Sequence, residues 1–398
     1  TRASEGKMQR RHFIKSAMYG VPGVLASGGL GGMAQAYAIT PKIQGNKAFT
    51  HPGLLHDERE LAFIKKQIES GDEPWLKVWG ELKQACNFFA DLGPDPRREV
   101  VRGPSNKPDI GGTEFSRDSA AAYAFALAWQ LSGDKAYARK AVDILNAWSA
   151  TLKRVDGHDT KLLIGMMGIK YVNAAELLRY SYDGWQREDQ SRFKAMLREQ
   201  FYEPIKDFYP TANGNWDASM IQTMLAMGVY LDDHDMFDRA ASYYREGGGN
   251  GAITNYFNEF GQCQETGRDQ GHTQMGLSFL SCACEMAWKQ GVDLYAEADN
   301  RLALGFEYTA KYNLGNDVRY EPYKSVEGRY HYRKISAKGR GDFAPIYRRL
   351  VYHYHHRLKM DMPFSRQAAE ADKEGRSLKR GWAYFRWTDL MFVRPPGE

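Results

Sequence analysis

The sequence has few cysteines and no long hydrophobic run. Four cysteines among 398 residues exclude a scaffold built on disulfides, because such domains need a much denser cysteine framework. No run of residues approaches the ~20 apolar positions that a membrane-spanning helix requires, and strand signals are scarce. Hydrophobic residues make up 43% of the chain and charged residues 26%, which is the balance of a folded globular protein.

The formal net charge of +5 at first favours a polyanionic partner, such as nucleic acid or an acidic polysaccharide. The position of the charge weakens that argument. Residues 1–38 contain five cations and one acid, so they hold +4 of the total and leave residues 39–398 near +1. An acidic polymer would therefore be held by locally placed arginine and lysine, and nucleic acid is not an expected partner.

Residues 1–38 have the features of an export signal. The pair Arg10-Arg11 precedes Phe-Ile-Lys at 13–15, the middle is rich in glycine and alanine, and Ala-Tyr-Ala ends it at 36–38. This order is typical of a twin-arginine secretory leader. We expect cleavage after Ala38, a periplasmic or secreted protein with no membrane attachment after export, and a single domain over residues 39–398.

The remainder of the sequence has helical periodicity almost throughout. Short turns at 132–134 and 232–234 separate helices that should be antiparallel neighbours. The predicted helices cover residues 58–70, 74–90, 115–132, 134–152, 160–180, 187–207, 216–231, 233–245, 272–290, 298–313 and 341–358.

Two kinds of helix alternate along the chain. Residues 118–131, 218–231 and 273–288 are apolar nearly all round and rich in small residues, which predicts helices buried on every side. Residues 135–150 place their apolar side chains on one stripe, which predicts one solvent-exposed face. This alternation predicts an all-α fold, an (α/α) toroid, which is an incomplete barrel of helical hairpins with six or seven inner helices. An irregular all-α bundle is the alternative.

Inner helices of a toroid run parallel, so their N-termini open at one end. Three polar segments that contain glycine lie at such starts, at 111–118, 213–217 and 264–272, and we expect them to converge on one mouth. The loop at 313–336 returns to the same mouth. It mixes tyrosines with arginines and lysines, and its length favours a functional loop over a solvated lid.

The segment from Gln264 to His272 leads directly into a buried helix. Its charged side chains are costly to bury without partners, so a structural salt bridge of Arg268 with Glu265 or Asp269 is one interpretation. A role in binding or catalysis is the other. If the segment is already helical, Arg268 and His272 share a face. His272 is either a structural histidine or, at the start of an inner helix, a functional one.

Asn215 and Trp216 follow a turn at Asn213-Gly214. Asn215 or Asp217 could cap the next helix, but an asparagine can also donate hydrogen bonds to a carboxylate. Trp216 would either stack on a sugar ring or pack in the core.

Two further clusters lack the spacing of a metal site. On a helix, His353, His355 and His356 do not give a ligand pair four residues apart, and Cys282 and Cys284 point to different faces. We expect no metal and no cofactor.

Several segments resemble bacterial alginate-lyase-domain proteins: HPGLLH at 51–56, the hairpin at 122–149, NGNWDASMIQTMLAMGVYLDD at 213–233 and QETGRDQGHTQMGL at 264–277. The resemblance covers about residues 48–360. It is nearest to the branch of polysaccharide lyases that includes β-1,4-glucuronan lyases and mannuronate-preferring alginate lyases. It implies an (α/α) toroid that cleaves an acidic polysaccharide, alginate or glucuronan, by β-elimination.

The resemblance also implies roles for individual residues. Removing the C5 proton of a uronate requires that its carboxylate be neutralised; Asn215 matches the motif's asparagine, and Arg268 is a candidate by position. Where better-known alginate lyases have a tyrosine, this sequence has His272, so a catalytic tyrosine would come from the 313–336 loop. Tyr323 is the first choice, ahead of Tyr320 and Tyr330, and nearby cations would lower its pKa. His272 and this tyrosine would share the acid and base roles. Candidates for substrate binding are Trp216, Gln264, Glu265, Tyr320, Arg329 and Tyr330.

Two other functions remain open from the sequence. An inverting glycoside hydrolase on the same architecture would use two carboxylates, such as Asp118 and Glu265, as acid and base. A non-catalytic periplasmic glycan-binding protein would use the same mouth without releasing a product.

Overall fold

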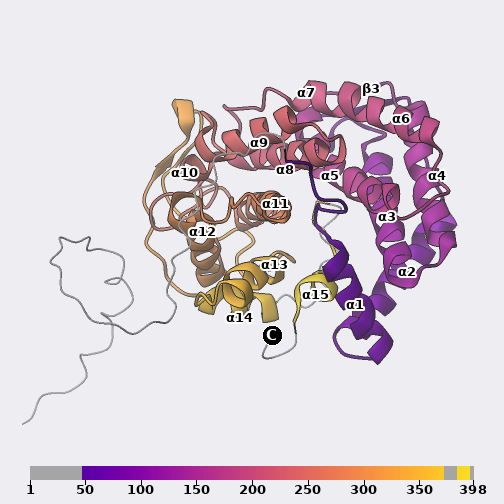
Figure 1. The fold of residues 1–398 in the computed structure, drawn as a ribbon. Coiled ribbons are helices and arrows are strands. Elements are labelled where there is room, and N and C mark those ends of the chain that lie inside the picture. Colours follow the sequence, from indigo (N-terminus) through magenta and orange to yellow (C-terminus); the bar gives the residue numbers. More distant parts are fainter. Residues whose placement is uncertain (1–46, 372–382, 395–398) are drawn as a thin grey trace, which may run out of the picture. The chain divides into compact units, whose positions relative to one another are not determined.

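Four long buried helices form the inner layer of the fold. In the computed structural model, which describes residues 47–371 and 383–394, these are α3 (Gly112–Ser132), α5 (Thr160–Arg179), α8 (Gly214–Tyr230) and α11 (Gln270–Lys289). Each packs against the next in chain order (Figure 1). Most side chains on them are buried, as the largely apolar sequence predicts.

Close approach of α5 and α8 depends on small residues. A Cβ atom at Gly165 would lie 2.2 Å from the hydroxyl oxygen of Ser219, and one at Gly168 would lie 2.8 Å from Thr223. Gln222 and Thr223 also donate hydrogen bonds to the carbonyl of Gly165, at 2.9 and 2.8 Å. The glycines thus bring the starts of two inner helices close together.

An outer layer of amphipathic helices returns the chain between the inner ones. α4 (Lys135–Thr151) pairs with α3, α9 (His234–Glu246) with α8, and α12 (Glu297–Asn313) with α11. Asp134 and Asp233 cap α4 and α9 by accepting backbone N–H groups. The predicted short turns between antiparallel helices are therefore confirmed.

The remaining elements are shorter. α1 (Glu58–Ser70), α13 (Tyr347–Val351) and α15 (Thr388–Phe392) continue the inner layer, because α13 contacts α15, α15 contacts α1 and α1 contacts α3. The other helices are α2 (Trp75–Leu92), α6 (Arg187–Met196), α7 (Glu203–Ile205), α10 (Ile253–Tyr256) and α14 (Pro363–Ala371), with π-helical turns at Leu197–Tyr202 and Tyr352–Arg357 and 3₁₀ turns at Pro104–Asn106 and Val326–Gly328.

Five short strands lie in the connections. β1 (Glu99–Arg102) pairs antiparallel with β2 (Asp109–Ile110) and parallel with β3 (Arg154–Asp156). β4 (Tyr323–Lys324) and β5 (His331–Tyr332) form a small hairpin. Both sheets belong to segments that precede or follow inner helices, so they border the helix ends rather than the core.

The structure also shows the extent of the folded unit and the state of the cysteines. The described residues all lie in one compact unit, Pro41–Glu398, whereas the predicted leader at 1–38 lies outside the described residues. The four cysteines are buried, free thiols. Among the described residues, no helix is both long and apolar enough to cross a membrane.

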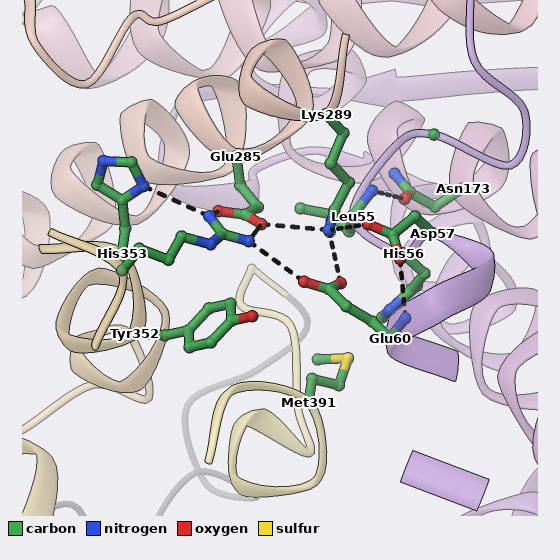
Figure 2. Close-up of polar contacts among 12 residues, drawn as sticks. Leu55, His56, Asp57, Glu60, Asn173, Glu285, Lys289, Tyr352, His353 and Met391 are labelled. Carbon is green, nitrogen blue, oxygen red and sulfur yellow. Dashed lines mark hydrogen bonds and ion pairs between the residues drawn. The ribbon is translucent and has the colours of Figure 1, made fainter. Parts of the chain in front are cut away.

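A buried ionic cluster joins the first and last helices of the inner layer (Figure 2). Lys289 lies 2.5 Å from Glu60, 3.3 Å from Asp57 and 3.3 Å from Glu285. Arg357, which follows α13, lies 2.8 Å from Glu285 and 3.2 Å from Glu60. Burial alone would raise the pKa of Glu285, but Lys289 and Arg357 hold that pKa well below its usual range. Burial raises the pKa of Glu60, although Lys289 opposes that shift. The cluster ties α1, α11 and the segment after α13 together.

The histidine-rich segment after α13 belongs to this cluster rather than to a metal site. His353 stacks on Tyr295 with ring centroids 3.6 Å apart, and its Nδ1 lies 3.4 Å from Arg357. His355 contacts the carbonyl of Met360 through Nδ1. Within residues 47–371 and 383–394, no group of three or more histidine, cysteine or acidic side chains is arranged to hold a metal ion.

Replacing Lys289 with methionine should destabilise the fold strongly, because the buried acids Glu285 and Glu60 then lose a cation. We expect the free energy of unfolding to fall by about 3–5 kcal/mol, measured by urea denaturation. Lys77→Met is the matched control, since Lys77 pairs with Glu81 at an exposed site and should change stability by less than about 1 kcal/mol. Equal losses in the two variants would contradict the role given to the cluster.

Burial of His353 predicts that the protein loses stability in mild acid. Burial lowers the pKa of His353 to about 3, whereas an unfolded histidine has a pKa of about 6.5. The unfolded chain therefore binds a proton that the folded chain excludes, and stability falls as the pH drops below about 6.5 and continues to fall toward about 3.

Between pH 7 and pH 5 this effect should cost about 2 kcal/mol. His353→Phe keeps an aromatic ring on Tyr295 but has no titrating group, so its stability should depend on pH less steeply by that amount. Urea denaturation of both proteins at the two pH values measures the difference. The same pH dependence in both proteins would show that His353 is not the group responsible.

Candidate active site

The N-terminal ends of α8 and α11 meet through a set of buried hydrogen bonds. The side chain of Gln264 accepts from the Gly214 N–H at 3.0 Å, and Glu265 accepts from the Asn215 N–H at 3.0 Å. Gln264 also donates to the side chain of Asn213 at 3.0 Å. These acceptors satisfy the first N–H groups of α8, which have no partner inside the helix, and a carboxylate is favourable at this positive end.

Glu265 and Gln264 lie beneath the surface, which differs from the role that the sequence predicts for them. Both side chains are fully buried. Glu265 also accepts hydrogen bonds from Tyr256 at 2.7 Å and from Arg268 at 2.7 Å, so it is the structural partner of Arg268 that the sequence left as an alternative. The structure thus makes Gln264 and Glu265 supports of the site rather than exposed contacts for a ligand.

Asn215 has an amide that the protein leaves largely unused. The side chain is buried, its Oδ1 has no hydrogen-bond partner, and its Nδ2 contacts only the sulfur of Met275, at 3.9 Å. Buried amides normally have partners, and the oxygen and nitrogen ends can exchange by a flip of the side chain. Asn215 therefore carries a side-chain oxygen that has no hydrogen-bond partner among the described residues.

Arg268 supplies a permanent positive charge at Glu265, the carboxylate that also accepts the Asn215 N–H. Its side chain is 28% exposed. Burial would lower the pKa of Arg268, but the charge of Glu265 and the hydrogen bond to it raise that pKa overall. Because only one acidic partner is in direct contact, the guanidinium keeps donors for an anion.

His272 is held by Asp269 at the start of α11. Asp269 accepts the His272 N–H through Oδ1 and the ring Nδ1 through Oδ2, both at 2.7 Å. Burial would raise the pKa of Asp269, but the two hydrogen bonds from His272 bring it down to about 2. A proton on Nδ1 leaves Nε2 as the basic nitrogen of the neutral ring. The histidine side chain is 36% exposed, so Nε2 can meet a ligand.

The 313–336 loop packs onto the segment that precedes α11. Ser336 N–H donates to Thr266 at 3.1 Å, and Gln270 donates to the carbonyl of Ser336 at 2.9 Å. Gln262 and Glu321 exchange two hydrogen bonds, at 2.8 and 2.9 Å. These bonds anchor the loop to the segment before α11, although most of its residues are exposed or half-buried.

Tyr332 is the loop tyrosine that reaches the buried joint, which is the set of hydrogen bonds between Gln264, Glu265 and the start of α8. Its hydroxyl donates to Asn213 Oδ1 at 3.1 Å. Burial, together with the charge of Glu265, raises the pKa of Tyr332 to about 12, although Arg268 and Asn213 oppose this shift. The phenol is therefore protonated at neutral pH and lies close to both charged groups of the joint.

The other loop tyrosines lie elsewhere. Tyr323 pairs with Tyr332 across the β4–β5 hairpin, but its hydroxyl donates to the carbonyl of Asn255, and burial raises its pKa. Tyr320 donates to the carbonyl of Tyr332 at 2.8 Å, and Tyr330 stacks on Tyr332 with ring centroids 6.3 Å apart. The structure does not bring Tyr323 to the joint. The sequence predicts a lowered pKa for a catalytic loop tyrosine, but the pKa values of Tyr323 and Tyr332 are both raised.

Trp216 lies on the first turn of α8, against two rings that the sequence did not single out. Its ring meets Tyr209 edge-on at 5.3 Å and His158 edge-on at 5.7 Å. Arg329 lies on the 313–336 loop, with its guanidinium over Tyr330 at 5.4 Å. The sequence did contain a signal for His158. This residue lies just before the inner helix α5, as Asn215 lies at the start of the inner helix α8.

The segment at the start of α3 is engaged in local contacts. Asp118 is buried, and it accepts hydrogen bonds from Trp148 at 2.8 Å, from the Asp95 N–H at 2.8 Å and from Arg117 at 2.7 Å. With Glu265 also buried and fully bonded, neither carboxylate of the hydrolase alternative is free to act as an acid or a base on a substrate.

The sequence and the fold are similar to those of known lyases. The alginate lyase family model matches residues 64–319. An alginate lyase from Bacteroides ovatus has a TM-score of 0.63 at 14% identity, with 86% of this chain and 100% of that chain covered. Alginate lyase A1-III from Sphingomonas species A1 has a TM-score of 0.57 at 15% identity, over 84% of this chain and 95% of that chain.

A variant of alginate lyase A1-III complexed with a tetrasaccharide has a TM-score of 0.59 at 17% identity, with 87% of this chain and 100% of that chain covered. No curated protein sequence is significantly similar to this chain. The structural likenesses confirm the predicted (α/α) toroid.

Removing the carboxylate of Glu265 should loosen the start of α8 selectively. In Glu265→Ala the buried Asn215 N–H loses its acceptor, which costs about 1–3 kcal/mol and should speed amide exchange there about 10- to 100-fold. Hydrogen exchange followed residue by residue measures the effect.

Glu307→Ala is the matched control, because Glu307 accepts the N–H groups of Phe364 and Ser365 at the start of α14. It should speed exchange at α14 and leave α8 unchanged. Faster exchange at α8 in both variants would mean that the loss is global and that Glu265 has no local role.

Proposed function

Because the chain belongs to the alginate lyase family and is a polysaccharide lyase, we propose that it cleaves a β-1,4-linked polyuronate, either mannuronate-rich alginate or glucuronan, by β-elimination. The observation that carries the proposal is the side-chain oxygen of Asn215, which has no partner among the described residues, on a residue whose N–H shares the carboxylate of Glu265 with Arg268. A neutral donor and a cation at the end of a buried joint suit a carboxylate, and a histidine and a phenol supply proton transfer.

The reaction requires charge neutralisation first. The C5 proton of a uronate lies next to the carboxylate, so its removal places further negative charge on a group that is already an anion. In the proposed mechanism Asn215 and Arg268 bind that carboxylate. Donors fixed before the reaction stabilise the developing charge most effectively, and Glu265 fixes both of them through the Asn215 N–H and the Arg268 guanidinium.

His272 and Tyr332 then have complementary roles. His272, with Nδ1 bonded to Asp269, offers Nε2 as the base that takes the C5 proton. The raised pKa of Tyr332 keeps its hydroxyl protonated, so it suits the acid that protonates O4 as the C4–O4 bond breaks. The C5–H electron pair becomes the C4–C5 double bond, and the products are an unsaturated uronide end and a new free O4 hydroxyl.

Both candidate substrates fit the same reacting groups. Mannuronate and glucuronate differ only in the configuration at C2, so the carboxylate, the C5 proton and O4 take the same positions in both. Guluronate has the opposite configuration at C5 and would present its proton to another face. We therefore expect cleavage of the first two polymers and little cleavage of guluronate blocks.

The site of action is also part of the proposal. The order of basic, glycine-rich and small residues at 1–38 supports export by the twin-arginine route. A periplasmic or secreted location would place the enzyme where polysaccharides first reach the cell.

Mixing the purified protein with polymannuronate, glucuronan and polyguluronate tests the function. Ultraviolet absorbance of unsaturated uronide ends should rise with at least one of the first two. His272→Ala and Tyr332→Phe should each lower kcat by about 10²- to 10⁴-fold, while Tyr323→Phe should retain nearly full activity because its hydroxyl bonds only a backbone carbonyl.

Reducing ends without absorbance would instead identify a hydrolase, and binding without any product would identify a glycan-binding protein. If Tyr323→Phe were inactive and Tyr332→Phe active, the assignment of the tyrosine would be reversed.

A further inference from the structure

A group of rings lies beside Asn215, on the side of the mouth toward α5. Trp216, the residue after Asn215, is half-buried, and Tyr209 and His158 meet its ring edge-on. Phe208, next to Tyr209, is buried in the core. The proton-transfer groups described above do not include any of these rings, so their exposed surfaces need another explanation.

The fold fixes this group through a buried carboxylate. Asp217 is fully buried and follows Trp216 on the first turn of α8. It accepts the Tyr209 N–H at 2.8 Å, the Tyr243 hydroxyl at 3.0 Å and the Gly251 N–H at 3.3 Å. Tyr243 in turn stacks on Phe208 with ring centroids 3.6 Å apart, so the short loop that carries Tyr209 is held on two sides.

The loop also adopts a strained backbone at this point. Phe208 has φ of +53°, a conformation that a bulky side chain rarely adopts and that the surroundings must enforce. The strain turns Phe208 inward and leaves Tyr209 half-buried at the surface. Such strain gathers where a protein must orient a particular side chain.

Positive charge accompanies the rings. The guanidinium of Arg329 hydrogen-bonds to the Tyr209 side chain, which raises the pKa of Arg329, and Lys161 lies 5.7 Å from the Tyr209 ring centroid. Arg329 comes from the 313–336 loop and Lys161 from α5. Cations from two separate segments thus converge on Tyr209.

We propose that Tyr209, Trp216, His158 and Arg329 form a binding subsite for a uronate unit next to the unit that is cleaved, and that Asp217 is the residue that positions it. This inference rests on the proposed function. The apolar C–H face of the sugar packs on the rings, and Arg329 binds the carboxylate, for which its planar guanidinium is suited. Trp216 follows Asn215 on the first turn of α8, so both residues lie at the same end of that helix.

Oligouronides of increasing length test the subsite. Tyr209→Ala and Arg329→Gln should each raise KM for polymer and long oligomers about tenfold, with kcat changed less than about twofold because the reacting groups are untouched. The shortest oligomers that are cleaved should show no change. Arg329 is exposed, so its replacement keeps the test valid if Tyr209→Ala folds poorly.

Tyr180→Ala is the matched control, since Tyr180 is an exposed tyrosine at the opposite, C-terminal end of α5. It should leave KM and kcat unchanged for every length. Asp217→Asn should raise KM in the same length-dependent way as Tyr209→Ala, whereas a merely structural role would lower activity equally for all lengths.

Failure of the subsite and failure of the function give different results. If the wild type cleaves polyuronates but Tyr209→Ala and Arg329→Gln match it at every length, the subsite is wrong and the lyase assignment stands. If the wild type cleaves no polyuronate, calorimetry with saturated mannuronate and glucuronate tetramers decides whether the rings bind uronate. Absence of binding there overturns the subsite as well.

Discussion

The site depends on one buried negative charge, the carboxylate of Glu265. It accepts the Asn215 N–H in the first turn of α8, the hydroxyl of Tyr256 and the guanidinium of Arg268. Each of these groups would be costly to leave alone in the interior. A single side chain therefore joins the start of α8 to the segment before α11 and holds the guanidinium of Arg268. In the proposed mechanism, the groups that bind the substrate carboxylate are thus held by the bonds that join the helices.

The fold could be predicted largely from sequence, because its two kinds of helix differ in a property that sequence records directly. A helix buried on all sides, such as α8, is apolar all round, while α9 shows one apolar stripe. Turn signals such as Gly133 and Asp134 mark the hairpins. The π-helical turns at Leu197–Tyr202 and Tyr352–Arg357 interrupt helices predicted as continuous, since an inserted residue leaves little trace in the periodicity.

The candidate site could be predicted only in part. Position at the start of an inner helix indicated Asn215 and His272, but it gave no information on which polar groups face inward. Gln264 and Glu265 accept hydrogen bonds from the first N–H groups of α8. These bonds join residues that are 50 positions apart in the sequence. Tyr332 was missed because the register of a two-residue hairpin is set by contacts to other segments, which sequence pattern does not record.

The ionic cluster behind the mouth carries a consequence for how the chain comes to be folded. Glu60 meets Lys289 across 229 residues and Arg357 across 297. During synthesis, the contact between Glu60 and Arg357 can therefore form only after almost the whole sequence has been made. Hairpins such as α3–α4 can form earlier from local contacts. Completion of the ring is thus a late event, and a chain that ends before Arg357 would keep its hairpins but leave Glu60 and Glu285 without that cation.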